Sequence, residues 1–158
     1  MGQVVFIDTS VMLNILDVPT MNTDRRPVLT EFIELQTSAT LVLPVATLIE
    51  TGNHIAHISD GGLRRKLATT FETAMRGALS KNPPWVLTGD AWNTSQMAIA
   101  ILDGNAHRPR AQELLTHGIG TGDVSILAEI DSYRKRIPSG ITIRLWTLDA
   151  ALLAYAPA

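Results

Sequence analysis

The stretch VVFIDTSVMLNIL, residues 4–16, decides how the rest of the chain is interpreted. Its first four residues are β-branched or aromatic, which is typical of a buried β-strand, and a helical pattern begins at Val11. The polar residues Asp8, Thr9 and Ser10 lie between the two. A carboxylate at such a junction either caps the helix or serves a site at the end of the strand.

The composition of the whole chain is that of a folded globular protein. It has 158 residues, of which 46% are hydrophobic, and this length predicts one domain spanning residues 1–158. No run approaches the roughly 20 consecutive apolar residues of a membrane span, and no basic leader precedes the first strand, so neither a membrane segment nor a secretory signal is expected. The absence of cysteine excludes disulfides, thiolate metal sites and cysteine nucleophiles, and is typical of a cytoplasmic protein.

Strand and helix patterns alternate along the chain. Helices are expected at residues 11–16, 28–34, 45–55, 63–79, 109–116, 123–136 and 150–155, and one capped by Asp90 and ending at residue 102. Strands are expected at residues 3–7, 40–43, 85–87 and 141–146. Strands separated by helices form parallel β-α-β units, so the sequence predicts a Rossmann-like α/β fold with a central parallel sheet and helices on both faces.

Four acids from distant segments are expected at one edge of that sheet. Asp8 follows the first strand and Asp149 the last, while Glu50 lies on the helix after the second strand. Asp123 opens the amphipathic helix, where the helix dipole favours a carboxylate. In a parallel sheet the carboxyl ends of the strands line the crevice that binds ligands.

Clustered carboxylates need a counter-charge. At a few Å they repel by roughly 1 to 4 kcal/mol per pair, and a hard divalent cation such as Mg²⁺ or Mn²⁺ removes that conflict. A simpler interpretation exists for each acid taken alone. Asp8 and Asp149 could be helix caps, Asp123 a partner of the helix dipole, and Glu50 a solvated helix residue.

Four sequence blocks together resemble the motif blocks of PIN-domain nucleases. They are FIDTSVMLNIL, LPVATLIETGNHI, GTGDVSILAEI and LWTLDAALLAY, and their order and spacing cover most of the chain. The resemblance is closest to small prokaryotic PIN proteins, including toxins of the VapC type. It implies a PIN fold and a Mg²⁺- or Mn²⁺-dependent endoribonuclease, the toxin of a type II toxin–antitoxin pair, held in check by an antitoxin protein and forming a homodimer.

The resemblance also implies roles for individual residues. Asp8, Glu50, Asp123 and Asp149 would be the catalytic acids that bind the metal. Ser10 and Thr147 match the hydroxyl residues of the first and last blocks, which would orient carboxylates or a water molecule at the metal. The reaction implied is metal-assisted attack of water on an RNA phosphodiester.

Contact with RNA would have to come from local basic patches, because the net charge is −2. One candidate patch contains Arg64, Arg65 and Lys66, and a second contains Arg108 and Arg110. A third, at residues 134–136, suits the end of its helix in any case. Charged runs on helices are more often solvated faces, so these residues are weaker candidates than the acids.

Other motif interpretations are less well supported. The segment GIGTG, residues 118–122, follows a helix rather than a strand and lacks the Gly-Lys-Ser/Thr ending of a phosphate-binding loop, which favours helix termination. Glu50, His54 and His57 share one helical face, so a histidine–carboxylate zinc site is conceivable, although no HExxH motif is present. The tryptophans are too scattered for a base-stacking platform.

Two rival functions come from other classes. A phosphatase or phosphoryl-transfer domain would use Asp8 as its nucleophile, but Ser10 stands where a second acid would be expected. A non-catalytic PIN scaffold that binds a partner protein would have a broken acidic set, whereas all four acids are present.

Overall fold

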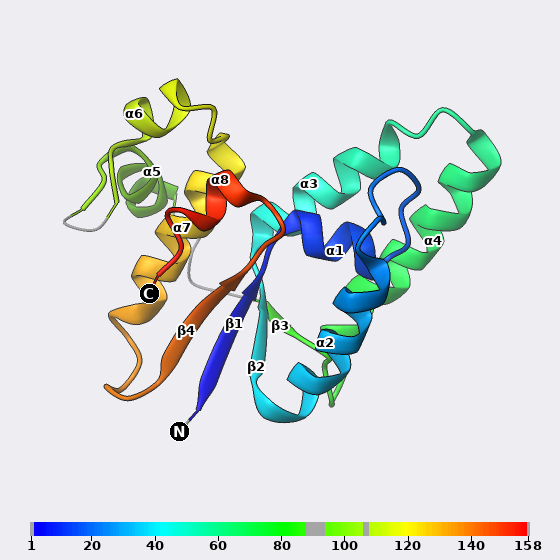
Figure 1. Cartoon of the computed structure of the whole chain (residues 1–158), viewed down its shortest axis with the longest axis horizontal. Helices are drawn as coiled ribbons and strands as arrows, with labels where there is room; N and C mark the ends of the chain where they lie inside the picture. The colour runs from blue at the N-terminus through cyan, green and yellow to red at the C-terminus, as the bar shows by residue number, and fades with distance from the viewer. Residues whose placement is uncertain (1, 88–93, 106–107, 158) are drawn as a thin grey trace.

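The fold is an α/β structure with an all-parallel sheet. The computed structural model describes residues 2–87, 94–105 and 108–157 (Figure 1). Its strands are β1 (Gln3–Ile7), β2 (Thr40–Leu43), β3 (Val86–Leu87) and β4 (Thr142–Trp146). Its helices are α1 (Thr9–Ile15), α2 (Arg25–Ser38), α3 (Val45–Ala56), α4 (Gly61–Gly77), α5 (Thr94–Leu102), α6 (Ala111–Thr116), α7 (Thr121–Arg134) and α8 (Ala150–Leu153). The predicted fold class is confirmed.

The sheet has the order β3-β2-β1-β4, and every pairing is parallel. The chain therefore proceeds in one direction from β1 to β3 and then returns to place β4 on the other side of β1. In sheets of this kind ligands bind where the strand order reverses, which here is between the carboxyl ends of β1 and β4. That is the location of Asp8 and of the segment from Thr147 to Asp149.

Both faces of the sheet are covered by helices (Figure 1). Alternate residues of β1 point to opposite sides, as the pleat requires. Val5 and Ile7 pack in one core cluster with residues of α1, α2 and α4, whereas Val4 and Phe6 pack in another with residues of α7. Strand β1 is thus buried on both sides, which explains its uninterrupted apolar sequence.

Several helices begin earlier than the sequence suggested. Helix α4 starts at Gly61 because the Asp60 side chain accepts a hydrogen bond from the Leu63 backbone N–H at 2.6 Å. Helix α2 starts at Arg25, inside the segment expected to be a turn, and Pro27 is tolerated there because N–H groups of a first turn have no helical partner. Asp90, the predicted cap of α5, lies outside the described residues.

No helix in the described ranges is both long and apolar enough to cross a bilayer.

Candidate functional site

Asp8 is held at the carboxyl end of β1 with only one of its two oxygens hydrogen-bonded. The residue is 3% exposed, and its Oδ2 accepts hydrogen bonds from Ser10 Oγ at 2.7 Å and from Thr147 Oγ1 at 2.8 Å. Oδ2 also accepts the Ser10 backbone N–H at 3.3 Å. Oδ1 is buried and has no hydrogen-bond partner within the described ranges. A bare buried carboxylate oxygen is costly, so Oδ1 is the natural contact for a ligand.

The two hydroxyls join the loops that follow β1 and β4. Ser10 Oγ accepts the Leu148 N–H at 2.9 Å while it donates to Asp8. Thr147 Oγ1 accepts the Asp149 N–H at 3.0 Å while it also donates to Asp8. Each hydroxyl therefore fixes the carboxylate and the neighbouring loop together. This geometry agrees with the predicted orienting role of both residues.

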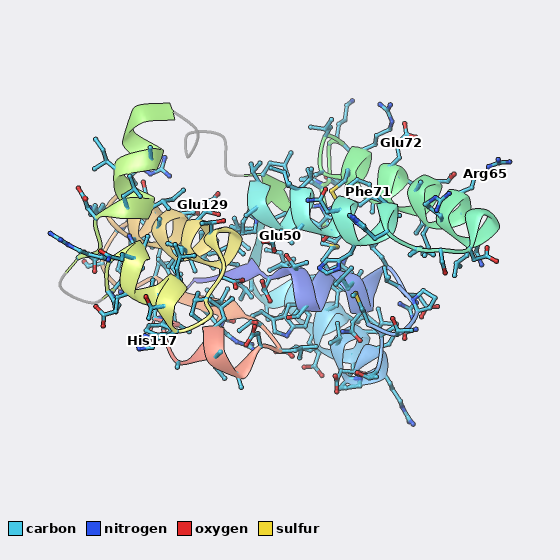
Figure 2. All side chains as sticks on the ribbon, turned by 90° about the horizontal axis from the view of Figure 1, so that it is seen from above. Glu50, Arg65, Phe71, Glu72, His117 and Glu129 are labelled. Carbon is cyan, nitrogen blue, oxygen red and sulfur yellow. The ribbon has the colours of Figure 1, made fainter. Side chains whose placement is uncertain are left out.

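Glu50 is positioned by two residues that sequence reasoning did not assign to it. Thr9 Oγ1 donates to Glu50 Oε2 at 2.7 Å, so Thr9 orients this acid. The Glu50 carboxylate also lies against the backbone of Gly122, where a Cβ atom would overlap it. Figure 2 shows Glu50 in the middle of the molecule. The adjacency of β1 and β2 was the available signal, because it brings α1 beside α3.

The negative charges of the other three acids act on the Asp123 carboxylate. It lies in the first turn of α7, and its pKa rises from 3.8 to about 6. Burial is the main cause, followed by repulsion from Asp8, Glu50 and Asp149, while a hydrogen bond to the backbone of Gly120 opposes the rise. Asp123 is therefore electrostatically coupled to each of the other three predicted acids.

Asp149 and Asp8 also act as helix caps. Asp149 Oδ1 accepts the N–H groups of Ala151 and Leu152, at 2.8 and 3.3 Å, and so caps α8. Asp8 Oδ2 caps α1 through the Ser10 N–H. Each capping contact uses only one oxygen of the carboxylate. Asp8 and Asp149 can therefore cap a helix and still contribute to a site at the edge of the sheet.

The acids surround one cavity of about 380 Å³, which we call the acidic cavity. Its lining residues are Asp8, Thr9, Ser10, Leu13, Asn14, Met21, Thr23, Asp24, Glu50, His54, Asp123, Leu148 and Asp149. The sequence predicted the convergence of the four acids. It did not indicate the contribution of Asn14, Met21 or Asp24, which come from α1 and the α1–α2 loop.

The donor set of the acidic cavity suits a hard divalent cation. Its candidate ligands are carboxylate and hydroxyl oxygens, which Mg²⁺ and Mn²⁺ prefer, and the bare Asp8 Oδ1 adds an unsatisfied acceptor. The oxygens are not pre-assembled, because no group of three or more acidic or histidine side chains in the described part of the chain is arranged to hold an ion. Side chains would have to turn inward to share one.

The alternative zinc site on α3 gains no support. Among the described residues, no group of three or more histidine and carboxylate side chains is arranged to hold a metal. One ring nitrogen of His57, Nδ1, is hydrogen-bonded to the Asn53 carbonyl at 2.7 Å.

The predicted basic residues have different environments. Arg108 is 6% exposed, and its guanidinium is bound to Asp131, with Nε to Oδ2 at 3.0 Å, and to the Ala100 carbonyl. This burial argues against the predicted contact of Arg108 with RNA and makes it a link between α5 and α7. Arg110 is exposed, as are Arg65 and Lys66.

Arg64 and its neighbours lie away from the acids. The Arg64 guanidinium donates to the Ile58 carbonyl at 2.6 Å, and Figure 2 shows Arg65 on the outer side of α4, far from Glu50. If this patch contacts RNA, it does so at a distance from the acidic cavity.

Comparison with known proteins gave no match: no family model matches the chain, and no curated protein and no solved structure is significantly similar to it.

Proposed function

We propose that the protein is a Mg²⁺- or Mn²⁺-dependent endoribonuclease whose active site is the acidic cavity. The observation that carries the proposal is the convergence of four carboxylates from four separate segments around one cavity, with the buried Asp8 Oδ1 left without a partner among the described residues. Such a set is costly to assemble unless it binds a cation. The location at the reversal of strand order supports the same conclusion.

Each residue contributes a definable part of the proposed chemistry. Asp8, Glu50, Asp123 and Asp149 would hold the ion, which would supply activation of water and stabilise negative charge on the phosphoryl oxygens. Ser10 and Thr147 fix Asp8 through Oδ2 and leave Oδ1 for a ligand, and Thr9 fixes Glu50. Asp8, Asp123 and Asp149 are held at the starts of helices, and Glu50 lies in the second turn of α3, so regular structure limits the movement of all four.

The resemblance to PIN-domain nucleases adds the rest of the proposal. It favours RNA as the substrate, a toxin of a toxin–antitoxin pair as the biological role, and an antitoxin and a second copy of the chain as partners. A cytoplasmic location is part of the same proposal.

The phosphatase alternative retains one supporting observation, which is the bare Oδ1 of Asp8. A nucleophilic carboxylate would use that oxygen to attack phosphorus. The position two residues later, however, is Ser10, whose hydroxyl is bound to Asp8 itself and is not an acid that could protonate a leaving group. The nuclease is therefore the better-supported function.

The test is cleavage of a labelled, structured RNA by the purified protein. We expect cleavage with Mn²⁺ and none in EDTA. Asp8→Asn should abolish cleavage while retaining the fold, because asparagine also caps helices. RNA cleavage that survives EDTA or the substitution would contradict the mechanism. Hydrolysis of p-nitrophenyl phosphate without RNA cleavage would support the phosphatase instead.

A further inference from the structure

A second cavity adjoins the acidic cavity, and we call it the flanking cavity. It has a volume of about 340 Å³, within the range of about 300–1,000 Å³ that is typical of small-ligand sites. Its lining residues are Val18, Pro19, Thr20, Met21, His54, His57, Ile58, Ser59, Asp60 and Leu63. Met21 and His54 line both cavities, so the two cavities are neighbours. A ligand long enough to pass these two side chains can occupy both.

His54 lies at the junction of the two cavities. It follows Glu50 by four residues on α3, which places both side chains on the same face of the helix. It is exposed, and no hydrogen bond in the described structure occupies its ring. An imidazole ring carries at least one N–H donor whether it is neutral or charged. His54 can therefore donate to an acceptor that spans the two cavities.

The walls of the flanking cavity suit a base better than a phosphate. Val18, Pro19, Met21, Ile58 and Leu63 provide apolar surface, and no arginine or lysine lines the cavity. The single carboxylate, Asp60, has one oxygen in the cap of α4. The remaining polar lining residues are Thr20, His54, His57 and Ser59. With no arginine or lysine the cavity offers a phosphate little counter-charge, whereas an unpaired base gains from apolar contacts combined with a few polar partners.

The wall formed by the α1–α2 loop is tightly fixed. Asp17 and Thr20 have positive φ angles of 61° and 68°, which are uncommon, above all for a β-branched residue. The loop is held by Asn14, whose side-chain oxygen accepts the Asp24 N–H at 3.1 Å, and by Arg25, which donates to the Asn14 carbonyl at 2.6 Å. A strained conformation persists only where its surroundings impose it, so this wall is preformed for a ligand.

We propose that the flanking cavity binds the unpaired base of the nucleotide next to the scissile phosphodiester, and that His54 donates a hydrogen bond to the phosphate between the two nucleotides. This inference rests on the proposed nuclease function and specifies its substrate as single-stranded RNA. A base must leave its stack to enter the cavity, and a duplex has to break a base pair as well, so a single strand should bind more tightly.

The test measures binding separately from cleavage. A fluorescently labelled single-stranded RNA of six nucleotides is titrated with the protein in Ca²⁺, and binding is followed by fluorescence anisotropy. Ser59→Trp fills the flanking cavity from a position that does not line the acidic cavity. His54→Ala removes the donor at the junction. His117→Ala is the matched control, because His117 lies on the other side of the molecule, at the end of α6 (Figure 2).

We expect Ser59→Trp and His54→Ala each to weaken binding roughly tenfold, the scale of a lost base contact, with His117→Ala at the wild-type value. A duplex of the same sequence should compete poorly. Equal affinities for all four proteins, or equal binding of duplex and single strand, would overturn the flanking site. Cleavage of the same RNA with Mn²⁺ is measured in parallel. Failure of the wild-type protein to cleave would remove the proposed function, while the binding data would still decide whether the flanking cavity binds a base.

Discussion

Two regions of this molecule bury a carboxyl group, and they do so with different consequences. Asp8 and Glu129 are 3% and 1% exposed, and each has one oxygen without a hydrogen-bond partner in the described structure. Asp8 lines a cavity with four more acids, Asp24, Glu50, Asp123 and Asp149, and its second oxygen accepts three hydrogen bonds. Glu129 lies in the middle of α7, within the run of buried residues 124–130. Burial of an acid does not by itself make a site, because the surroundings decide what the acid can do.

Burial favours the protonated, uncharged form of Glu129. Its pKa rises from 4.5 to about 8, mainly through burial, and the charge of Arg136 opposes the rise only in part. The side chain is therefore mostly uncharged at neutral pH. The acids of the acidic cavity are partly open to water and close to one another, so a cation can relieve their repulsion. The neighbouring charge that acts on Glu129 is that of Arg136, and no other acid in the described ranges contributes to its raised pKa.

The largest expected effect is on the pH dependence of stability at Glu129. An acid with a raised pKa in the folded state binds more protons than in the unfolded state, so stability falls as pH rises from about 4.5 to about 8. The slope approaches 1.4 kcal/mol per pH unit, on the order of several kcal/mol in total. Glu129→Gln cannot lose a proton, so it should lack this component. Urea unfolding of both proteins between pH 5 and pH 9 measures the difference.

The same variant also tests the comparison itself. Because Glu129 lies outside the acidic cavity, Glu129→Gln should cleave RNA like the wild-type protein. If Glu129→Gln loses cleavage while it remains folded, the separation of the two regions is wrong. If both proteins have the same pH dependence, Glu129 does not carry a raised pKa.

At Asp123 we expect an effect of about 2 kcal/mol on the free energy of unfolding, less than the full pKa shift would give because the side chain is only half-buried. Unlike Glu129→Gln, a substitution of this acid should also affect cleavage. Its raised pKa means that metal-free wild-type protein loses stability as pH rises from about 4 to about 6 and does not regain it above that range. Asp123→Asn removes the repelled charge, so at pH 8 in EDTA it should melt at a higher temperature than the wild-type protein. Cleavage should be lost.

Addition of Mn²⁺ should reverse that order of stability. The wild-type protein should gain melting temperature with Mn²⁺, whereas Asp123→Asn should gain little, since binding to the folded state is what stabilises. Scanning calorimetry with and without the ion provides the measurement. A variant that is less stable than the wild-type protein in EDTA at pH 8 would show that repulsion does not act on Asp123.

The smallest effect concerns Thr9. Thr9→Val keeps the shape of the side chain but removes the hydroxyl that binds Glu50, so Mn²⁺ affinity and cleavage should fall by roughly tenfold. Thr9→Ser retains the hydroxyl and should remain close to wild type. Isothermal titration with Mn²⁺ separates this role from a purely structural one, and equal Mn²⁺ affinities for the Val and Ser variants would exclude it.

Much of this architecture was predictable from local patterns. Strands β1 and β2 were placed with their observed ends, because each is a short apolar run bounded by residues that stop it. The four acids were predicted to meet because the carboxyl ends of parallel strands share an edge. Helix starts were less accurate, since the caps Asp24 and Asp60 precede the apolar pattern by several residues.

Contacts between distant segments were not predictable in the same way. The pairing of Thr9 with Glu50 spans 41 residues, and that of Arg108 with Asp131 spans 23. Neither is encoded by a local pattern, because each depends on how closely two distant segments approach. A charged residue such as Arg108 therefore resembled a solvated one in the sequence, although it is buried in the structure.

Gly122 and Glu50 are 72 residues apart in the sequence but are in close contact. Which residues one position tolerates therefore depends on the residue at the other. A side chain at position 122 would take the space of the Glu50 carboxylate, so a larger residue fits there only if that carboxylate turns away from its place beside Thr9 or position 50 changes as well. In related chains the two positions should therefore vary together: a chain that keeps glutamate at 50 should keep glycine at 122. A chain that replaces this glycine should have a rearranged or missing second acid.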